Sequence, residues 1–294
     1  MHGNTTGRPT PDAAAAGTVT LGGVLTVNRM AFGAMRLTGH GIIGPPADPA
    51  ECRRVLQRAV DLGVTFIDTA DSYGPAVSET LIAEALHPYP AGLVIATKAG
   101  LERPGPHQWK ANGHPAHLRA CCEASLLRLR VDRIDLFQLH RIDPAVPAAD
   151  QFGTLADLTA EGKIHLVGLS EVGVEAIERA RRTLPIVSVQ NRYNVADRTW
   201  DAVVDYCTKE GVAFIPWYPL GAGALPVQTA LDAVARARGA TPQQVALAWL
   251  LARSPVMLPI PGTSKVAHLE ENVAAATLVL DPDERRLLDR LVSP

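Results

Sequence analysis

The chain has 294 residues, with 28 Lys or Arg against 30 Asp or Glu, so its formal charge at neutral pH is −2. This balance excludes the basic surface that a nucleic-acid partner would require. Apolar residues make up 47% of the chain, which excludes collagen-like, coiled-coil and disordered classes for its bulk. No apolar run reaches the roughly 18 residues of a membrane helix. We therefore expect a globular protein without a nucleic-acid or membrane partner.

The first 18 residues are rich in Gly, Pro, Ala and Thr, and no basic start precedes a long apolar stretch. We expect residues 1–18 to form a mobile tail rather than a secretory signal, and residues 19–294 to form one domain. The four cysteines form neither a CxxC pair nor a zinc spacing; they are Cys52, Cys121, Cys122 and Cys207. Reduced thiols in the cytoplasm are the expectation that follows.

The first expected elements are a hairpin and a helix. Residues 19–27 alternate apolar and polar side chains around Gly22-Gly23, a pattern typical of a short hairpin. Asp48 is a favourable N-cap, Pro follows at the first helical position, and Glu51 stands where a capping box places it. This helix is expected to end at Gly63.

From there, short apolar runs alternate with helical patterns to the end of the chain. The expected strands are residues 29–35, 64–68, 93–98, 134–140, 164–170, 186–190, 212–217 and 256–260. The helical segments between them are expected near residues 78–86, 115–129, 149–161, 174–182, 199–210 and 242–253. The strands are apolar on both faces, as strands covered by helices should be.

Eight strand–helix units over roughly 250 residues predict an α/β fold, a (β/α)8 TIM barrel, with the short hairpin capping its bottom. A doubly wound sheet is the competing fold, but it needs a glycine-rich phosphate turn, and no G-x-G-x-x-G follows a strand here. Residues 99–114 and 218–228 are expected to be loops. Both follow strands, so both should lie over the carboxyl end of the barrel, where active sites of this fold are found.

Polar side chains end several of the expected strands. Asp68 ends the second strand, with Tyr73 five residues later, and Lys98 and His140 end the third and fourth. A buried Asp and Lys should pair, because neither is tolerated alone in an apolar barrel. A cation beside a phenol lowers the phenol pKa from about 10, which would make Tyr73 a proton donor near neutral pH. His140 could then hold a substrate carbonyl.

The runs FIDTADSYG, IATK and LFQLH that contain these residues resemble the catalytic motifs of the aldo-keto reductase superfamily, in the same order. The resemblance extends from about Val19 to Ser293. It implies that Asp68, Tyr73, Lys98 and His140 form a catalytic tetrad in which Tyr73 is the general acid. It also implies the reduction of an aldehyde or ketone to an alcohol by a hydride from NADPH.

The resemblance places the nicotinamide at the ends of strands five to seven, the pyrophosphate under residues 219–225, and the adenosine phosphate along residues 260–272. Within this last segment, residues 262–265 are expected to lead into a helix. The cofactor-binding residues that the resemblance implies are Met35, Ser170, Gln190, Trp217, Pro219, Leu220, Gly221, Gly223, Gly262, Thr263, Ser264, Lys265, His268, Glu271 and Asn272. Trp109 and Tyr218 are the candidate substrate contacts.

Three positions depart from common family residues. Glu171 stands where many members have Asn, Gly262 where a basic residue is common, and His268 where an arginine is frequent. Lys265, Ser264 and Thr263 then remain for the phosphate, so NADPH is the preferred cofactor, and use of NADH stays open.

The run GHGIIGPP and the short loop after strand seven further resemble a bacterial branch of the family that includes pyridoxal reductase. Pyridoxal is therefore one candidate among small carbonyl substrates. The alternative function is an NADPH-binding redox-sensing or regulatory subunit with little turnover. No metal site is expected, because no HxH or HExxH motif occurs. The expected state is a monomer or a weak homo-oligomer.

Overall fold

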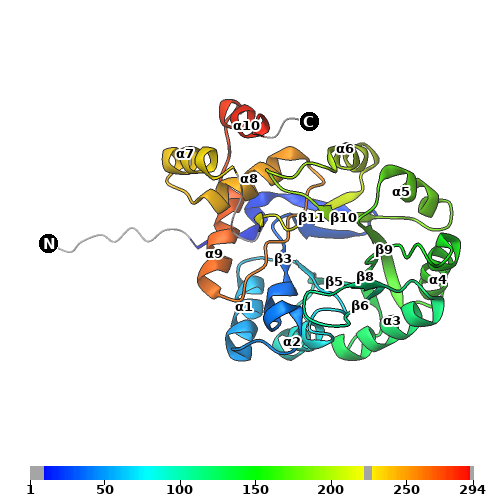
Figure 1. Cartoon of the computed structure of the whole chain (residues 1–294). Coiled ribbons are helices and arrows are strands. Elements are labelled where there is room, and N and C mark those ends of the chain that lie inside the picture. The colour runs from blue at the N-terminus through cyan, green and yellow to red at the C-terminus, as the bar shows by residue number, and fades with distance from the viewer. Residues whose placement is uncertain (1–9, 222–226, 292–294) are drawn as a thin grey trace.

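A computed structural model describes residues 10–221 and 227–291. Within that part of the chain, seven parallel strands form one curled sheet in the order β11-β10-β9-β8-β5-β4-β3. Helices surround this sheet on its outer side (Figure 1), which confirms the (β/α)8 class of fold. The strands are β3 (Phe32–Gly33), β4 (Phe66–Asp68), β5 (Val94–Ala99), β8 (Ile134–Leu139), β9 (Ile164–Ser170), β10 (Ser188–Arg192) and β11 (Ala213–Trp217).

The eighth strand expected at residues 256–260 does not form a regular strand. Its backbone still closes the barrel. Phe214 exchanges two backbone hydrogen bonds with this segment (2.9 and 2.8 Å), and two amides at β3 donate to the carbonyls of Pro259 and Pro261 (3.1 and 3.4 Å). The two prolines have no N–H to donate, so a continuous ladder cannot form. The expectation of a regular strand is therefore wrong, although the segment occupies the eighth position.

The helices follow the strands as the sequence pattern predicts, and α1 begins as expected, with the Asp48 carboxylate accepting a hydrogen bond from the Glu51 amide (2.9 Å). Two described helices were not expected, α7 and α10. The helices are α1 (Pro49–Asp61), α2 (Val77–Leu86), α3 (Pro115–Leu129), α4 (Ala148–Ala160), α5 (Val174–Arg181), α6 (Asp201–Glu210), α7 (Gln228–Arg238), α8 (Pro242–Arg253), α9 (Val266–Ala274) and α10 (Pro282–Asp289). None of these described helices is long and apolar enough to cross a bilayer.

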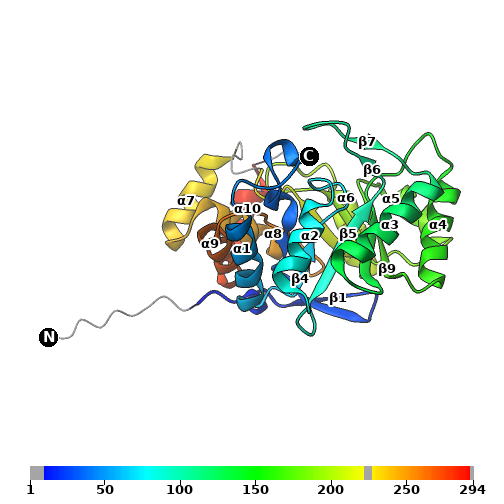
Figure 2. The same cartoon turned by 90° about the horizontal axis from the view of Figure 1, so that it is seen from below.

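The expected hairpin consists of β1 (Thr18–Leu21) and β2 (Leu25–Asn28), paired antiparallel around a turn that starts at Gly22. It lies across the end of the barrel opposite the β6–β7 ladder described below (Figure 2). The Asn28 side chain donates to the carbonyl of Gly63 (2.7 Å), just before β4. The hairpin therefore covers the amino ends of the strands, as predicted.

Part of the expected tail packs against the barrel. Ala13–Ala16 form a 3-10 turn capped by the Asp12 side chain. The amide of Ala13 donates to the carbonyl of Leu62 (2.8 Å), and the Ala13 side chain is buried. Residues 1–9 of the expected tail lie outside the described residues.

The expected loop at residues 99–114 contains a small ladder at the carboxyl end of the barrel. Its strands are β6 (Leu101–Glu102) and β7 (Lys110–Ala111), paired antiparallel. Figure 2 shows them at the far side of the molecule from β1. The intervening residues 103–109 thus form a compact turn above the mouth of the barrel rather than an unstructured connection.

Candidate active site

The carboxyl ends of the strands open into a cavity of about 1020 Å³. Asp68, Tyr73 and His140 line it, and Lys98 lies just beneath, within hydrogen-bond distance of two of them. Both candidate substrate contacts, Trp109 and Tyr218, also line the cavity. The structure therefore brings the four predicted tetrad residues together at the place where active sites of this fold are found.

Lys98 is the centre of a buried hydrogen-bond network. Its ammonium donates to a carboxylate oxygen of Asp68 (2.6 Å), to the carbonyl of Thr69 (2.8 Å) and to the hydroxyl of Tyr73 (3.3 Å). The Lys98 side chain is fully buried, so these three acceptors replace its water. Burial opposes the charge, but the neighbouring Asp68 and Tyr73 outweigh it and raise the pKa of Lys98. Lys98 is therefore a stable buried cation.

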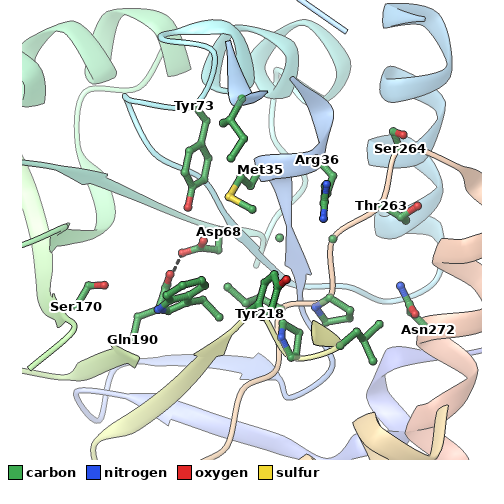
Figure 3. Close-up of a pocket in the computed structure, with 18 of the residues that line it drawn as sticks. Met35, Arg36, Asp68, Tyr73, Ser170, Gln190, Tyr218, Thr263, Ser264 and Asn272 are labelled. Atoms are coloured by element: carbon green, nitrogen blue, oxygen red, sulfur yellow. Dashed lines mark hydrogen bonds between the residues drawn. The ribbon is translucent and has the colours of Figure 1, made fainter. Parts of the chain in front are cut away.

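The second carboxylate oxygen of Asp68 is also satisfied. It accepts hydrogen bonds from the amides of Gln138 (3.1 Å) and Gln190 (2.8 Å). Figure 3 shows the bond from Gln190, which reaches Asp68 across the cavity floor. Both carboxylate oxygens of Asp68 therefore have hydrogen-bond donors. Gln138, which sequence reasoning did not single out, is thus part of the site.

Tyr73 is buried beside this cation, and its ring has 6% of its surface exposed. Burial raises the pKa of Tyr73, while the Lys98 ammonium acts in the opposite direction. The net direction is upward, so the expected lowering is wrong: loss of water around the phenol outweighs the cation. Tyr73 consequently keeps its proton at neutral pH.

His140 lies against Tyr73, with the two ring centroids 6.0 Å apart. Burial lowers the pKa of His140 well below its ordinary value, and the nearby cations Lys98, Arg141 and Arg103 lower it further. The imidazole is therefore neutral. Its Nδ1 lies 3.4 Å from the hydroxyl of Ser72, which leaves Nε2 for a group in the cavity.

At the nicotinamide end, Ser170, Gln190 and Trp217 line the cavity as the resemblance implied. Glu171 is held in the left-handed backbone region (φ 55°). Its carboxylate accepts hydrogen bonds from the Trp217 indole N–H (2.6 Å) and from the Arg192 amide (2.6 Å). Glu171 therefore fixes the orientation of Trp217. The sequence comparison, in which Glu171 stands where many members have Asn, did not predict this role.

Most of the other predicted cofactor residues also line the cavity. These are Met35, Pro219, Leu220, Gly262, Thr263, Ser264, His268, Glu271 and Asn272. Gly221 does not line it, and Gly223 lies outside the described residues. Thr263, Ser264 and Asn272 lie on the opposite side of the opening from Tyr73 (Figure 3), so the residues expected to bind the adenosine lie apart from the expected proton donor.

Lys265 is the exception at the adenosine end. It does not line the cavity, and its side chain is exposed near the carboxylates of Asp48 and Glu51. The Glu51 carboxylate also accepts the amide hydrogen bond of Val266, the first residue of α9 (3.2 Å). The expectation that Lys265 is the main cation for a phosphate therefore has no support from its position.

Arg36 offers a cation that sequence reasoning missed. It lines the cavity and lies between Met35 and Thr263 (Figure 3). Among the described residues it makes neither a hydrogen bond nor an ion pair. Gly262 lies beside it, and a Cβ there would come within 2.5 Å of the carbonyl oxygen of Gly33. The backbone therefore excludes the basic residue that the family commonly has at this position.

Several known proteins are similar to this chain in sequence. A family model described as "Aldo/keto reductase family" matches residues 29–293. An uncharacterized oxidoreductase from Schizosaccharomyces pombe is 54% identical over 95% of this chain and 90% of its own length. Pyridoxine 4-dehydrogenase from Escherichia coli is 43% identical over 91% of this chain and 96% of its own length.

Solved structures show the same fold. A thermostable aldo-keto reductase in complex with the inhibitor epalrestat superposes with a TM-score of 0.83 at 29% identity, covering 94% of this chain and 99% of that one. An aldo-keto reductase from Klebsiella pneumoniae in complex with NADPH gives a TM-score of 0.79 at 27% identity, covering 93% of this chain and 94% of that one.

Proposed function

The chain belongs to the aldo/keto reductase family, and on that premise we propose that it reduces an aldehyde or ketone to an alcohol with NADPH. The observation that carries the proposal is the hydrogen bond (3.3 Å) from the buried Lys98 ammonium to the Tyr73 hydroxyl. The neutral His140 lies next to this pair at the cavity. This arrangement joins a proton donor, a cation that stabilises its conjugate base, and a neutral hydrogen-bond donor.

The cavity fits a nicotinamide dinucleotide. The Trp217 indole forms a wall beside Ser170 and Gln190, while Asn272 and Ser264 supply polar groups at the far end. When bound, the cofactor supplies the hydride that reaches the carbonyl carbon. Trp217, held by Glu171, restricts where a flat ring can lie, which is how a protein contributes to hydride transfer.

The proton comes from the chain itself. Tyr73 donates its hydroxyl proton to the carbonyl oxygen as that oxygen becomes an alkoxide. Lys98 stabilises the resulting phenolate, and the side chain of Asp68 holds Lys98 in place. His140 donates a hydrogen bond from Nε2 to the same carbonyl oxygen, which orients it toward Tyr73.

Pyridoxal, reduced to pyridoxine, is the substrate we propose. The 43% identity to an enzyme named pyridoxine 4-dehydrogenase supports it. So do the aromatic walls of the cavity, Trp109 and Tyr218, which suit a flat ring. The same groups would run the reverse oxidation when the oxidised cofactor is in excess.

NADPH is the cofactor we propose as preferred, with Arg36 and His268 as the side chains that hold its phosphates. Arg36 lies midway along the cavity, where the pyrophosphate common to both cofactors would pass, and His268 lines the cavity from α9, the helix that also carries Asn272. We expect Arg36→Gln to weaken NADPH and NADH alike by about tenfold. His268→Ala should weaken NADPH alone. Titration of cofactor fluorescence measures both, and a loss confined to NADPH in Arg36→Gln would contradict this placement.

We further propose that residues 19–294 act as one domain and that the protein works in the cytoplasm as a monomer or a weak homo-oligomer. The four cysteines, none of them in a disulfide, support a reducing compartment.

Cofactor consumption tests the proposed function. Pyridoxal is supplied beside simple aldehydes and ketones, once with NADPH and once with NADH. Strong NADPH-dependent turnover of pyridoxal would support the proposed reaction, the proposed cofactor and the proposed substrate together. Turnover of simple carbonyls alone supports a reductase and removes pyridoxal. Tight NADPH binding without turnover of any carbonyl would contradict the proposal and favour a regulatory subunit.

A further inference from the structure

Arg103 joins three loops at the mouth of the barrel. Its guanidinium donates to the carbonyls of Gly41 (2.7 Å) and Ile42 (2.9 Å), in the connection before α1. It also donates to the carbonyl of Ser72 (3.2 Å), next to Tyr73, and to the carbonyl of Gln108 (2.9 Å) in its own turn. A planar guanidinium can reach so many acceptors at once because its five N–H groups form a rigid fork.

The same guanidinium covers one face of Trp109. The Cζ atom of Arg103 lies 3.7 Å from the indole centroid, which is a close cation–π contact. Trp109 in turn meets Tyr73 and His140 edge to face, with centroids 6.4 and 6.0 Å away. Arg103 thus occupies one face of the indole, and Trp109 also lines the cavity.

Apart from this contact, Trp109 meets the site through its edge contacts with Tyr73 and His140. The residue is 38% exposed, and the residues that precede it in the turn, 104–108, include no buried residue. Such an exposed turn has few contacts to fix an aromatic side chain. Arg103 therefore connects the turn that carries Trp109 to the neighbouring loops of the site.

We propose that Arg103 is a positioning residue that fixes Trp109 as a wall of the substrate site, and that this wall favours carbonyls borne on a flat aromatic ring over aliphatic ones. The inference rests on the proposed carbonyl reduction. Because Arg103 covers Trp109 and contacts neither of the proposed cofactor ends, its removal affects the carbonyl substrate and leaves cofactor binding unchanged.

A double-mutant cycle tests the proposal. Arg103→Met should raise the KM for pyridoxal or benzaldehyde about tenfold and the KM for propanal less than about twofold. The KM for NADPH should not change. Trp109→Leu should reproduce this pattern, and the double variant should be no worse than Trp109→Leu alone. Additive losses, or equal losses for aromatic and aliphatic aldehydes, would overturn it.

Two further variants serve as controls for the cycle. Arg103→Lys keeps the charge but cannot span the four carbonyls, so it should behave like Arg103→Met; full activity in this variant would refute the positioning role. Arg133→Met is the matched control, because Arg133 is exposed and lies at the opposite end of the barrel, just before β8. It should leave every constant unchanged.

A spectroscopic readout makes the proposal independent of turnover. With 5-fluorotryptophan incorporated, the fluorine resonance of Trp109 is identified by its loss in Trp109→Phe. It should shift and broaden in Arg103→Met or, if that variant does not fold, in Arg103→Lys. An unchanged resonance would overturn the inference. Wild-type protein that reduces no carbonyl at all would instead refute the proposed function while leaving this result valid.

Discussion

Tyr73 and Lys98 show how burial divides the tasks of the site at the level of single residues. Burial raises the pKa of Tyr73, so the phenol enters the reaction with its proton. Lys98 stays protonated because its ammonium forms an ion pair with the Asp68 carboxylate at 2.6 Å. The cation therefore acts on the phenolate that forms during the reaction rather than on the resting phenol.

Replacing Tyr73 separates chemistry from binding. Tyr73→Phe removes the hydroxyl and its hydrogen bond from Lys98 and keeps the ring. We expect turnover to fall at least about a hundredfold, the range of general acid catalysis, while the affinity for NADPH changes little. Steady-state rates and cofactor titration measure the two effects. Undiminished turnover would show that another group supplies the proton.

Asp71 is a buried acid outside the proposed reaction. Among the described residues its Oδ1 has no hydrogen-bond partner. Burial raises its pKa to about 7, with Glu79 acting in the same direction and Cys121 and Arg128 against it. The folded protein thus holds a proton that an unfolded chain releases near pH 3.9. Its contribution to stability is complete below about pH 4 and is lost as the pH rises to about 7.

Asp71→Asn should remove this dependence. Between pH 5 and pH 7, the wild-type protein should lose on the order of 1 kcal/mol of unfolding free energy per pH unit relative to the variant. Urea unfolding of both proteins at pH 5, 6, 7 and 8 measures the difference. A difference that stays constant with pH would mean that Asp71 is ionised throughout.

The sequence predicts some of these residues and not others, for a physical reason. Asp68, Lys98 and His140 could be found because polar side chains at the ends of apolar strands must meet at one end of a parallel barrel. Arg36 and Arg103 could not, because they lie in connections whose path depends on tertiary contacts. The predicted direction of the Tyr73 pKa shift was wrong, because the spacing of residues in the sequence reveals a charged neighbour but not how deeply the phenol is buried.

At the level of elements, explicit capping chemistry predicted α1 but was overlooked before α10. The Asp-Pro-x-Glu pattern of α1 recurs before α10, where Asp281 and Glu284 form a capping box, so the signal for α10 was present in the sequence. The segment at residues 256–260 failed as a strand because Pro259 interrupts the ladder. The predicted position of this segment in the barrel was nevertheless correct. Its apolar side chains determine that it is buried, whereas backbone hydrogen bonding determines whether it forms a regular strand.

The hairpin under the barrel offers a matched pair of glycines. Both have a positive φ (57° for Gly22, 75° for Gly23), so an alanine at either position carries about 1 kcal/mol of backbone strain. A Cβ at Gly22 would also meet Val187 at 2.9 Å, whereas Gly23 faces open space. We expect Gly22→Ala to destabilise the fold by about 2 kcal/mol more than Gly23→Ala. Thermal and urea unfolding measure this, and equal losses would show that the hairpin yields without cost.

For the whole molecule, Arg29 connects the beginning of the barrel to its end. Its guanidinium donates to the carbonyls of Leu251 (2.6 Å), Ser254 (2.6 Å) and Met257 (3.1 Å), more than 220 positions later in the chain. These bonds connect the residues just before β3 to the end of α8 and to the segment that completes the barrel. They do so where a regular ladder is missing, so Arg29 replaces part of the hydrogen bonding of the eighth strand.

Arg29→Met should therefore weaken the whole fold rather than one loop. We expect a loss of about 3 kcal/mol of unfolding free energy, because three charged hydrogen bonds disappear and their carbonyls lose a partner. Urea unfolding measures this, and activity below the transition should be unchanged. Arg285→Met, on the exposed face of α10, is the control. A loss no larger than that of the control would mean that closure does not depend on Arg29.

The turn above the mouth has a consequence for how this protein can change over generations. Residues 104–108 place no side chain in the core, yet they adjoin the wall of the substrate site. Mutations there can alter the choice of substrate without reducing the stability that the barrel and its hairpin provide. A library of variants confined to these positions should yield new substrate preferences at nearly constant melting temperature. Selection could then change the substrate preference at this turn while it conserves the residues of the barrel.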